Sequence, residues 1–283
     1  MYKMLLISTC ERQSYQITKS NQAATLRYIC HMEFQFKGYR FDMEHPLDIS
    51  TPLHTDKNQI NCYYAPPFNA TPVVMGNFIG DINQGGSVNY KNVELNPHGN
   101  GTHTECVAHI SNLNITINKA LIQFHFLALL ISVHPEIAKN GDSIISATSV
   151  IDKIKIIPEA LIVRTLPNKK DKLQKQYSGT NPTYFEPALF QWAAENNIQH
   201  FLTDLPSIDR EDDGGKLLAH RAFFQYPEAP RLHSTITELI YVPNKIPDGL
   251  YLLNLQIASF ELDAAPSKPV LYKLIDEKEM GRM

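Results

Sequence analysis

The sequence predicts a strand-rich α/β fold with only a few helices. Residues 124–133 and 160–165 are almost continuously apolar, which is typical of strands that are buried on both faces. Residues 249–261 alternate apolar and polar side chains with the period of a half-buried strand. Residues 186–196 are the clearest helix, because Pro187 occupies the first turn and apolar side chains recur at helical spacing. A chain of 283 residues fits one large domain or two small ones.

Residues 1–31 differ from the rest of the chain, and we assign them to an N-terminal extension. A short apolar stretch follows Lys3, but it is too short for a signal peptide and lacks a small-residue cleavage site. A convincing strand opens only at Met32, so a start of translation at that residue is an open alternative. We expect residues 1–31 to be poorly packed or disordered, and we place the folded domain at residues 32–283.

The beginning of this domain is predicted to contain short strands and one long loop. Residues 33–41 alternate around a Lys-Gly turn, which is a hairpin signature. Short strands are expected at residues 46–50 and 87–95. Residues 52–83 between them are rich in Pro, Asn and aromatic side chains, and loops of this length are often functional. Three aromatic side chains of this loop either line a pocket or pack as ordinary surface residues: Tyr63, Tyr64 and Phe68.

The remaining elements follow from the same patterns. A turn at residues 140–142 precedes a β-rich run at 143–151, and the lysine-rich stretch 166–184 is predicted to be a solvated loop. Residues 216–224 form a short amphipathic helix, which Pro227 and Pro230 end. Further strands are expected at residues 198–202 and 235–242.

Composition excludes several classes of partner. The net charge is -3 and no basic block occurs, so nucleic acid is not an implied partner. No run of eighteen apolar residues is present, so no membrane span is expected. The four cysteines, Cys10, Cys30, Cys62 and Cys106, show no C-x-x-C pairing, which favours reduced thiols in a cytoplasmic protein.

The segment from Asn96 to His109 concentrates the chemistry-bearing side chains. His98, His103, Glu105 and His109 fall within it, and Pro97, Gly99 and Gly101 punctuate its backbone. In an extended segment, His103 and Glu105 point to the same side, and His109 shares their parity. Imidazole and carboxylate groups on one side suit a divalent cation. Cys106 has the opposite parity to Glu105, which favours a structural thiol.

Gly101-Thr102-His103-Thr104-Glu105, with His109 following, resembles the signature of the metal-dependent cyclase family, to which kynurenine formamidase (arylformamidase) and isatin hydrolase belong. The family signature reads His-x-Gly-Thr-His-x-Asp-x-Pro-x-His. Glu105 replaces the family Asp, and Val107 replaces the Pro. Gly99 stands at the position of the first His, so that His98 is one residue early and has the wrong parity for an extended segment.

The resemblance implies a swivelling β/β/α domain and a set of metal ligands. Ala219-His220-Arg221-Ala222 resembles the downstream metal-binding segment of the family, and Glu238-Leu-Ile resembles its last carboxylate ligand. Glu105 would bridge two divalent ions, Zn²⁺ or Mn²⁺. His103, with His98 if it reaches, would hold the first ion, whereas His220 and Glu238 would hold the second.

Other family positions imply supporting roles. His109 would carry a proton to the leaving amine, while Asp204 and Asp209 are candidates for holding the ligands in place. Asp263-Ala-Ala-Pro266 resembles the closing turn of the family. His233 rivals His220, but its Pro-flanked loop favours exposure. Each of these residues, taken singly, also has a structural interpretation. His220 could be a hydrogen-bonded core histidine, Glu238 a charge on a strand face, and Asp204 a helix or turn cap.

By resemblance, the protein hydrolyses a C–N amide bond, with N-formyl-L-kynurenine of tryptophan catabolism as the expected substrate and L-kynurenine and formate as products. A homodimer or homotetramer is expected. One alternative is a relative that opens a cyclic amide such as isatin, or that cyclises its substrate. An alternative of another class is a metal-binding protein whose decayed site has no turnover, which the departures at Gly99, Glu105 and Val107 would suit.

Overall fold

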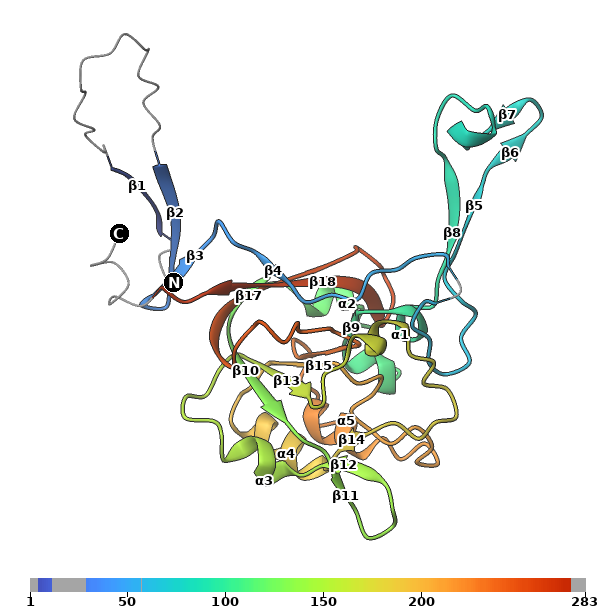
Figure 1. Ribbon diagram of the computed structural model, residues 1–283. Helices are drawn as coiled ribbons and strands as arrows, with labels where there is room; N and C mark the ends of the chain where they lie inside the picture. The colour runs from blue at the N-terminus through green and yellow to red at the C-terminus, as the bar shows by residue number, and fades with distance from the viewer. Residues whose placement is uncertain (1–4, 12–28, 57, 276–283) are drawn as a thin grey trace, which may run out of the picture.

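The computed structural model describes residues 5–11, 29–56 and 58–275, with side chains from residue 34 onward. The central feature is an eight-stranded sheet that curls into a barrel-like layer (Figure 1). Because its first and seventh strands also pair, seven strands close the ring, and the eighth is attached at the edge. In spatial order the strands are β17 (Gly249–Ile257), β10 (His125–Val133), β13 (Ala160–Thr165), β15 (His200–Thr203), β16 (Thr235–Glu238), β9 (His103–Glu105), β18 (Ala264–Lys273) and β4 (Leu47–Asp48).

The middle of this sheet is parallel and its flanks are antiparallel. The ladders β10–β13, β13–β15 and β15–β16 are parallel. Antiparallel pairing joins β10 to β17, β17 to β18, and β9 to both β16 and β18. The parallel strands are connected through helices, because a parallel crossover cannot be made by a tight turn.

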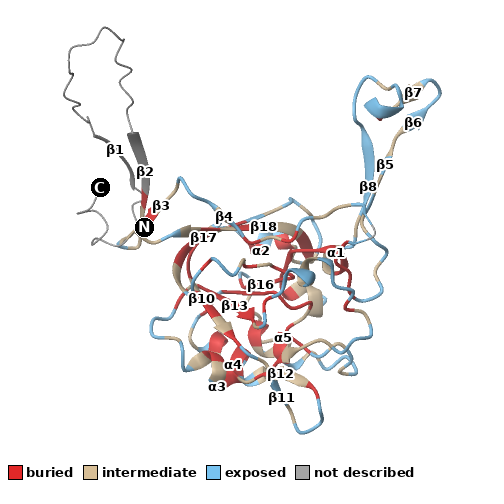
Figure 2. Cartoon of the chain, viewed as in Figure 1, coloured by how far each residue is buried: buried red, intermediate tan, exposed pale blue. Residues whose placement is uncertain are grey.

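Successive side chains of the strands pack alternately into two different hydrophobic cores. Ile162 of β13 points inward, where it meets Leu130 and Leu202, its register partners on the neighbouring strands. Leu161 and Val163 point outward and pack under the helices. Both sets are buried (Figure 2), which explains why these strands read as continuous apolar runs rather than as alternating ones.

A layer of helices covers one outer face of the sheet: α3 (Ala147–Ile151), α4 (Pro187–Glu195) and α5 (Leu218–Phe224). Phe190 of α4 lies at its centre. Its ring meets Phe201 of β15 edge-to-face at a centroid distance of 4.8 Å and Phe223 of α5 at 6.1 Å. Aromatic rings bury a large area in such contacts, so this cluster fastens α5 to the sheet.

Smaller elements surround the barrel. A hairpin of β2 (Ile29–Phe36) and β3 (Tyr39–Asp42) covers Leu127 and Leu252 on another outer face, and β1 (Leu5–Glu11) pairs antiparallel with β2. The other short elements are α1 (Pro97–Asn100), η2 (Val107–Ile110), α2 (Ile117–Ala120), β11 (Glu136–Ile137), β12 (Ser143–Ile145), η3 (Lys170–Gln174) and β14 (Tyr184–Phe185).

A two-stranded arm projects from the body between residues 68 and 95 (Figure 1). It consists of β5 (Asn69–Pro72), β6 (Val74–Met75), β7 (Phe78–Ile79), η1 (Ile82–Gln84) and β8 (Lys91–Glu94). Most of the arm is exposed (Figure 2). Its exposed apolar side chains include Val74, Met75, Ile82, Val88, Tyr90 and Val93.

The strand-rich α/β expectation is confirmed, and the strongest local patterns are confirmed with it. The strands expected at 124–133 and 160–165 are β10 and β13, the helix expected at 186–196 is α4, and the hairpin expected at 33–41 is β2–β3. The expectation for residues 1–31 falls largely outside the described residues, which omit 1–4 and 12–28. Within the part that the structure describes, no helix has the length and apolar character needed to cross a bilayer.

Several local expectations were wrong. The stretch 52–83 is not one irregular loop, because it contains β5, β6, β7 and the start of η1. The run 143–151 is a strand only as far as Ile145, and the rest is helix α3, which packs Val150 into the helix-covered core. The stretch 166–184 is not simply solvated, because Tyr177 is buried and Lys172 forms an ion pair with buried Asp204. Residues 263–266 do not form a closing turn, since β18 begins at Ala264 and closes the barrel. In each case tertiary packing overrode a local pattern.

Buried His200 should make the stability of the protein depend on pH. It begins β15, is 2% exposed, and its Nδ1 lies 2.8 Å from Thr235 Oγ1. Burial, helped by the charge of Arg231, lowers the pKa of His200 from 6.5 to about 3. Between pH 6.5 and about pH 3, His200 is therefore protonated in the unfolded chain but neutral in the folded chain. Proton binding then favours the unfolded chain, so the free energy of unfolding falls as the pH falls through this range.

We expect the wild type to lose about 2 kcal/mol more unfolding free energy between pH 7 and pH 5 than the His200→Gln variant loses. Urea denaturation of both proteins at the two pH values measures the difference. Equal losses in the two proteins would show that His200 does not titrate in this way.

Candidate metal centre

The register of β9 sets the framework of the centre. His103 lies opposite Glu238 of β16, and Glu105 lies opposite Ile236. Alternation along the strand sends His103 and Glu105 to the helix-covered face, as their spacing predicted. Thr104 points inward instead, where its hydroxyl lies 2.8 Å from that of Thr237.

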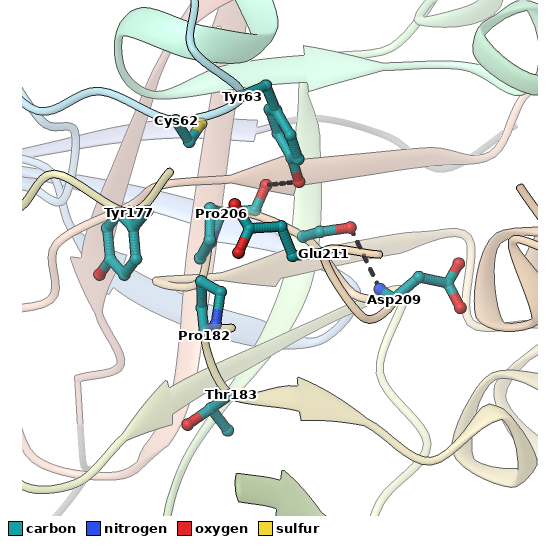
Figure 3. A pocket seen from close by; sticks show the side chains of 9 residues that line it. Cys62, Tyr63, Tyr177, Pro182, Thr183, Pro206, Asp209 and Glu211 are labelled. Atoms are coloured by element: carbon teal, nitrogen blue, oxygen red, sulfur yellow. Dashed lines mark hydrogen bonds between the residues drawn. The ribbon is translucent and has the colours of Figure 1, made fainter. Parts of the chain in front are cut away.

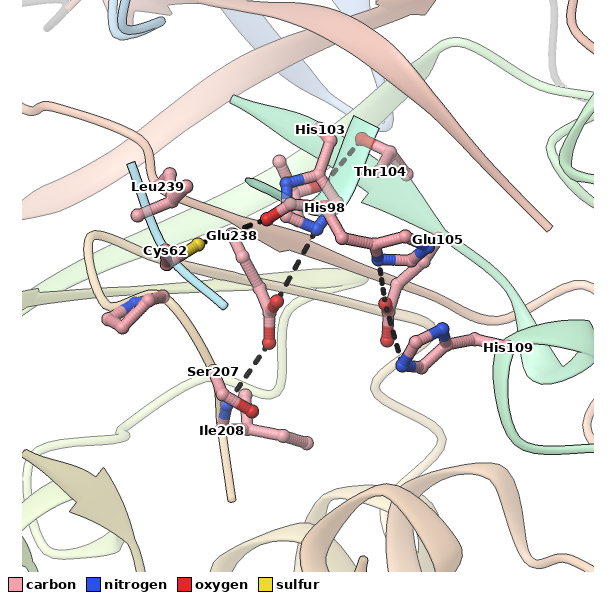
Figure 4. A network of polar contacts seen from close by, with 12 residues as sticks. Cys62, His98, His103, Thr104, Glu105, His109, Ser207, Ile208, Glu238 and Leu239 are labelled. Carbon is pink, nitrogen blue, oxygen red and sulfur yellow. Dashed lines mark hydrogen bonds and ion pairs between the residues drawn. The ribbon is translucent and has the colours of Figure 1, made fainter. Parts of the chain in front are cut away.

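Four imidazoles gather around Glu105 and Glu238, and Figure 4 shows those of His98, His103 and His109. Helix α5 contributes His220, whose Nε2 lies 2.9 Å from Glu105 Oε1. The Nε2 atom of His103 lies 3.4 Å from Glu238 Oε2. On the other side of Glu105, Oε2 is 3.3 Å from His98 Nδ1 and 3.7 Å from His109 Nε2. The structure thus brings together all five predicted ligands and the predicted proton carrier.

The segment around His98 is not extended, which removes the parity objection. Asn96 caps the one-turn helix α1, and this turn swings the His98 ring to a centroid distance of 5.0 Å from His103. A Cβ atom at Gly99 would lie 2.2 Å from Ala65 Cβ, so the turn can pack here only with glycine at that position. The expectation that His109 continues an extended segment was likewise wrong, because it lies in η2.

Each imidazole has an acceptor on its far side. Carboxylate and carbonyl oxygens only accept hydrogen bonds, so the ring nitrogen facing them must donate. His103 Nδ1 donates to Gly101 O at 3.0 Å, and His220 Nδ1 donates to Asp209 Oδ2 at 2.7 Å. His98 Nε2 and His109 Nδ1 both face Asp263 Oδ2, at 2.9 and 3.1 Å. In the neutral rings, the remaining nitrogens therefore carry lone pairs and face the carboxylates.

This arrangement fits a divalent cation. His103 Nε2 and Glu105 Oε2 are buried polar atoms without a hydrogen-bond partner among the described residues. Lone pairs that face one another without a proton are unfavourable, and a cation between them relieves the conflict. Three sets of ligand atoms lie within 4.8 Å of one another: His98–His103–Glu105, Glu105–His109–His220 and His98–His109–Asp263. Imidazole and carboxylate donors suit Zn²⁺ or Mn²⁺.

The charges of the centre also favour a cation. Burial opposes ionisation of Glu105, but its electrostatic interactions with His109 and His220 hold its pKa well below the usual range. Burial opposes protonation of His220, yet Glu105 and the bond to Asp209 hold its pKa well above the usual value. The pKa of His98 is raised to about 10, against the effect of burial, by Asp263 and Glu105. A metal would compete with these protons, so its affinity should fall as the pH falls.

The two aspartates predicted to hold ligands behave differently. Asp209 accepts the His220 Nδ1–H and the backbone N–H groups of Ala219 and His220, so it orients a predicted ligand. Asp204 is not brought to the ligands. Its carboxylate accepts from Thr165 N and from Lys172 Nζ at 2.7 Å, and it fastens the segment after β13.

Two residues of the centre were not singled out from the sequence as site residues. Asp263 precedes β18 and reaches the centre because Ala264 lies opposite Glu105 in the sheet. Cys62 belongs to the long loop, and its Sγ donates to His98 O at 3.2 Å (Figure 4). No local pattern signals either contact, because both partners are distant in sequence. His233 is exposed, as expected, and Cys106 is fully buried in the inner core.

A pocket adjoins the centre beside Asp209 (Figure 3). Tyr63 lines it, and its hydroxyl donates to Pro206 O at 3.0 Å. Tyr64, by contrast, is 79% exposed, and Phe68 lines a separate cavity near the base of the arm. The aromatic-pocket interpretation of the loop is thus supported for Tyr63. The other lining residues are Cys62, Tyr177, Pro182, Thr183, Pro206, Ser207 and Glu211.

Asp209 generates a prediction about metal affinity. The Asp209→Asn variant keeps an oxygen acceptor but loses the charge that holds the His220 ring, so we expect metal affinity to fall about 10- to 100-fold. Competition with a chromophoric chelator measures this change. Asp171→Asn is the matched control, because Asp171 is exposed on η3. An affinity equal to that of the control would contradict the role of Asp209.

Comparisons with known proteins place this geometry in context. No curated protein matches the chain. Among solved structures, a "predicted metal-dependent hydrolase" from Bacillus stearothermophilus is 15% identical, with a TM-score of 0.56 over 81% of this chain and 98% of that chain. Isatin hydrolase A from Labrenzia aggregata is 14% identical, with a TM-score of 0.56 over 81% and 93%. Isatin hydrolase A from Ralstonia solanacearum is 12% identical, with a TM-score of 0.57 over 82% and 92%.

These structures share the fold of this chain, which confirms the swivelling β/β/α architecture that the resemblance implied. The family model described as "Putative cyclase" matches residues 41–210, which is more than half of the chain and includes α1, β9 and η2, the elements that carry His98, His103, Glu105 and His109. The chain therefore belongs to this cyclase family.

Proposed function

We propose that this protein is a metal-dependent hydrolase of a C–N amide bond, and that its substrate is an N-formyl arylamine such as N-formyl-L-kynurenine. The observation that carries the proposal is the convergence of one ring nitrogen from each of four histidines on the buried carboxylates of Glu105 and Glu238. Two of the buried atoms in this group, His103 Nε2 and Glu105 Oε2, have no hydrogen-bond partner among the described residues, and a bound cation would satisfy both. Membership of the cyclase family supports the hydrolysis of a C–N amide bond. The arylformamide substrate is a more specific proposal within that reaction class.

The two oxygens of Glu105 support a bridging role. Oε1 faces His220, whereas Oε2 faces His98 and His109. In the proposed centre, His98, His103 and Glu105 would hold one ion, and Glu105, His220 and Glu238 would hold the other. Glu238 is steadied by the Ile208 N–H, which donates to its Oε1 at 3.0 Å. Bound ions would supply Lewis acidity toward the amide carbonyl and would lower the pKa of water.

In the proposed reaction, His109 carries the protons. It is partly exposed, unlike His103 and His220, and its Nδ1 is engaged by Asp263 while Nε2 faces the centre. An imidazole with one fixed N–H and one free lone pair can accept a proton from the attacking water and return it to the leaving nitrogen. The expulsion of an arylamine requires that second transfer.

A cyclic amide is the second candidate substrate, because isatin hydrolases are among the proteins of similar fold. Opening isatin also breaks a C–N amide bond, so the same residues would serve. An ultraviolet assay with N-formylkynurenine and with isatin separates the two substrates. Turnover of neither, despite bound metal, would favour the metal-binding protein without turnover.

We expect metal analysis of the purified protein to find two ions per chain and the assay to show hydrolysis of N-formylkynurenine. The Glu105→Gln variant should lose at least one ion and about 10²-fold or more in rate, because a neutral amide bridges cations poorly. Glu261→Gln is the matched control, since that carboxylate is exposed and bonds Thr116 and Asn118. Unchanged stoichiometry in Glu105→Gln would contradict the bridging role.

We expect the His109→Ala variant to keep both ions and to lose about 10²- to 10⁴-fold in rate, the usual contribution of a positioned acid–base group. Metal analysis and steady-state kinetics on the same preparation measure both quantities. If metal is lost instead, His109 is a ligand, as the Glu105–His109–His220 grouping would permit.

A further inference from the structure

Asp263 makes an unusual pair of contacts at the edge of the centre. A single oxygen, Oδ2, lies 2.9 Å from His98 Nε2 and 3.1 Å from His109 Nδ1. The backbone that carries this carboxylate is fixed by the same sheet as Glu105, because Cys106 N donates to Asp263 O at 3.0 Å and Ala264 lies opposite Glu105. The carboxylate therefore has a defined position relative to the proposed ligands.

The two contacts determine which nitrogen of each ring faces the metal. A carboxylate only accepts, so His98 must donate from Nε2 and His109 from Nδ1. The nitrogens left over are His98 Nδ1 and His109 Nε2, and both face Glu105 Oε2.

The same contacts explain how His98 can serve as a metal ligand although it lies one residue before Gly99, the position of the first histidine in the family signature. Gly99 has no side chain to offer as a ligand, and the neighbouring His98 of α1 supplies an imidazole instead. His98 presents Nδ1 to the centre rather than Nε2, and Asp263 occupies the other side of the ring. The His98 and His109 rings lie 4.3 Å apart with an interplanar angle of 32°, so one carboxylate can hold both.

We propose that Asp263 is a positioning residue that sets the tautomer and orientation of His98 and His109 together. His98 is thereby kept as an Nδ1 ligand, and His109 is kept as a base with a free Nε2. The roles of the two histidines rest on the proposed function. An acceptor on the far side of a metal-bound imidazole is the general means by which proteins fix that ring.

The hydrogen-bond geometry favours this role over direct coordination by Asp263. Its contacts with the two rings are at ordinary N–H···O distances, and they engage the nitrogens that point away from Glu105. A cation placed among Asp263, His98 and His109 would use those same nitrogens and would leave the lone pair of Glu105 Oε2 unsatisfied.

Nuclear magnetic resonance of the zinc-loaded protein, labelled with ¹⁵N-histidine, tests the proposal directly. In the wild type we expect one histidine protonated at Nε2 with zinc at Nδ1, and its signals should be absent from His98→Ala. The His109 ring should carry its proton at Nδ1. In Asp263→Ala, we expect both rings to lose their single tautomer and the affinity for one ion to fall about 10- to 100-fold.

Kinetics supply a second readout. The turnover number of Asp263→Ala should fall while KM changes little, and Asp263→Asn should be intermediate because its amide oxygen still accepts one bond. Glu261→Gln, which alters an exposed carboxylate of the same loop, should match the wild type in every measurement. Circular dichroism at increasing temperature confirms that each variant is folded.

Two results would overturn the proposal. Wild-type tautomers in folded Asp263→Ala would show that the carboxylate does not set them. Loss of a whole ion with both tautomers retained would make Asp263 a ligand. If the tautomers and metal affinity change as expected but the wild type hydrolyses neither amide, the proposed function fails and the role of Asp263 stands, because resonance and metal binding require no substrate.

Discussion

The three-residue strand β9 lies between β16 and β18, and its register decides which side chains meet at the centre. Pairing with β16 sets His103 beside Glu238, and pairing with β18 brings Asp263 next to the strand that carries Glu105. A shift of one residue would turn His103 and Glu105 into the apolar interior and Thr104 toward the helices. Burial of Thr104 against Thr237 on the inner face opposes such a shift.

Folding brings buried polar groups together at the centre, and their proximity is unfavourable in the absence of a cation. Glu105 is fully buried beside several imidazoles, and buried acceptors without donors cost free energy. The phenylalanine cluster around Phe190 supplies rigid packing that holds α5, and therefore His220, against the sheet despite this cost. A bound cation would convert the same conflict into a set of ligand bonds, so metal binding and stability should be coupled.

The departure from the family signature at Gly99 has a structural explanation. The family pattern places its first histidine where this chain has Gly99, and the one-turn helix α1 brings His98 into reach instead. The close approach of Ala65 to Gly99 shows that α1 is packed against the long loop, whose Cys62 also holds His98 O. The ligand turn and the pocket wall formed by Tyr63 are therefore parts of one packed unit.

Local sequence patterns determined much of the fold. Continuous apolar runs identify β10 and β13, and the Pro187 start with helical spacing identifies α4, because buried strands and amphipathic helices leave short-range signatures. The spacing of His103 and Glu105 likewise determined that they share a face. The family motif pointed to His220 and Glu238 as their partners, and the structure brings all four together.

Only the tertiary structure decided the rest. It showed that α1 is a turn of helix, that Asp204 serves Lys172 rather than a ligand, and that β18 is a strand that closes the barrel. It also brought Asp263 to two histidines more than 150 residues away in sequence, through the pairing of β9 with β18. Such contacts leave no local pattern, since sheet register and long-range packing depend on residues that meet only in the folded chain.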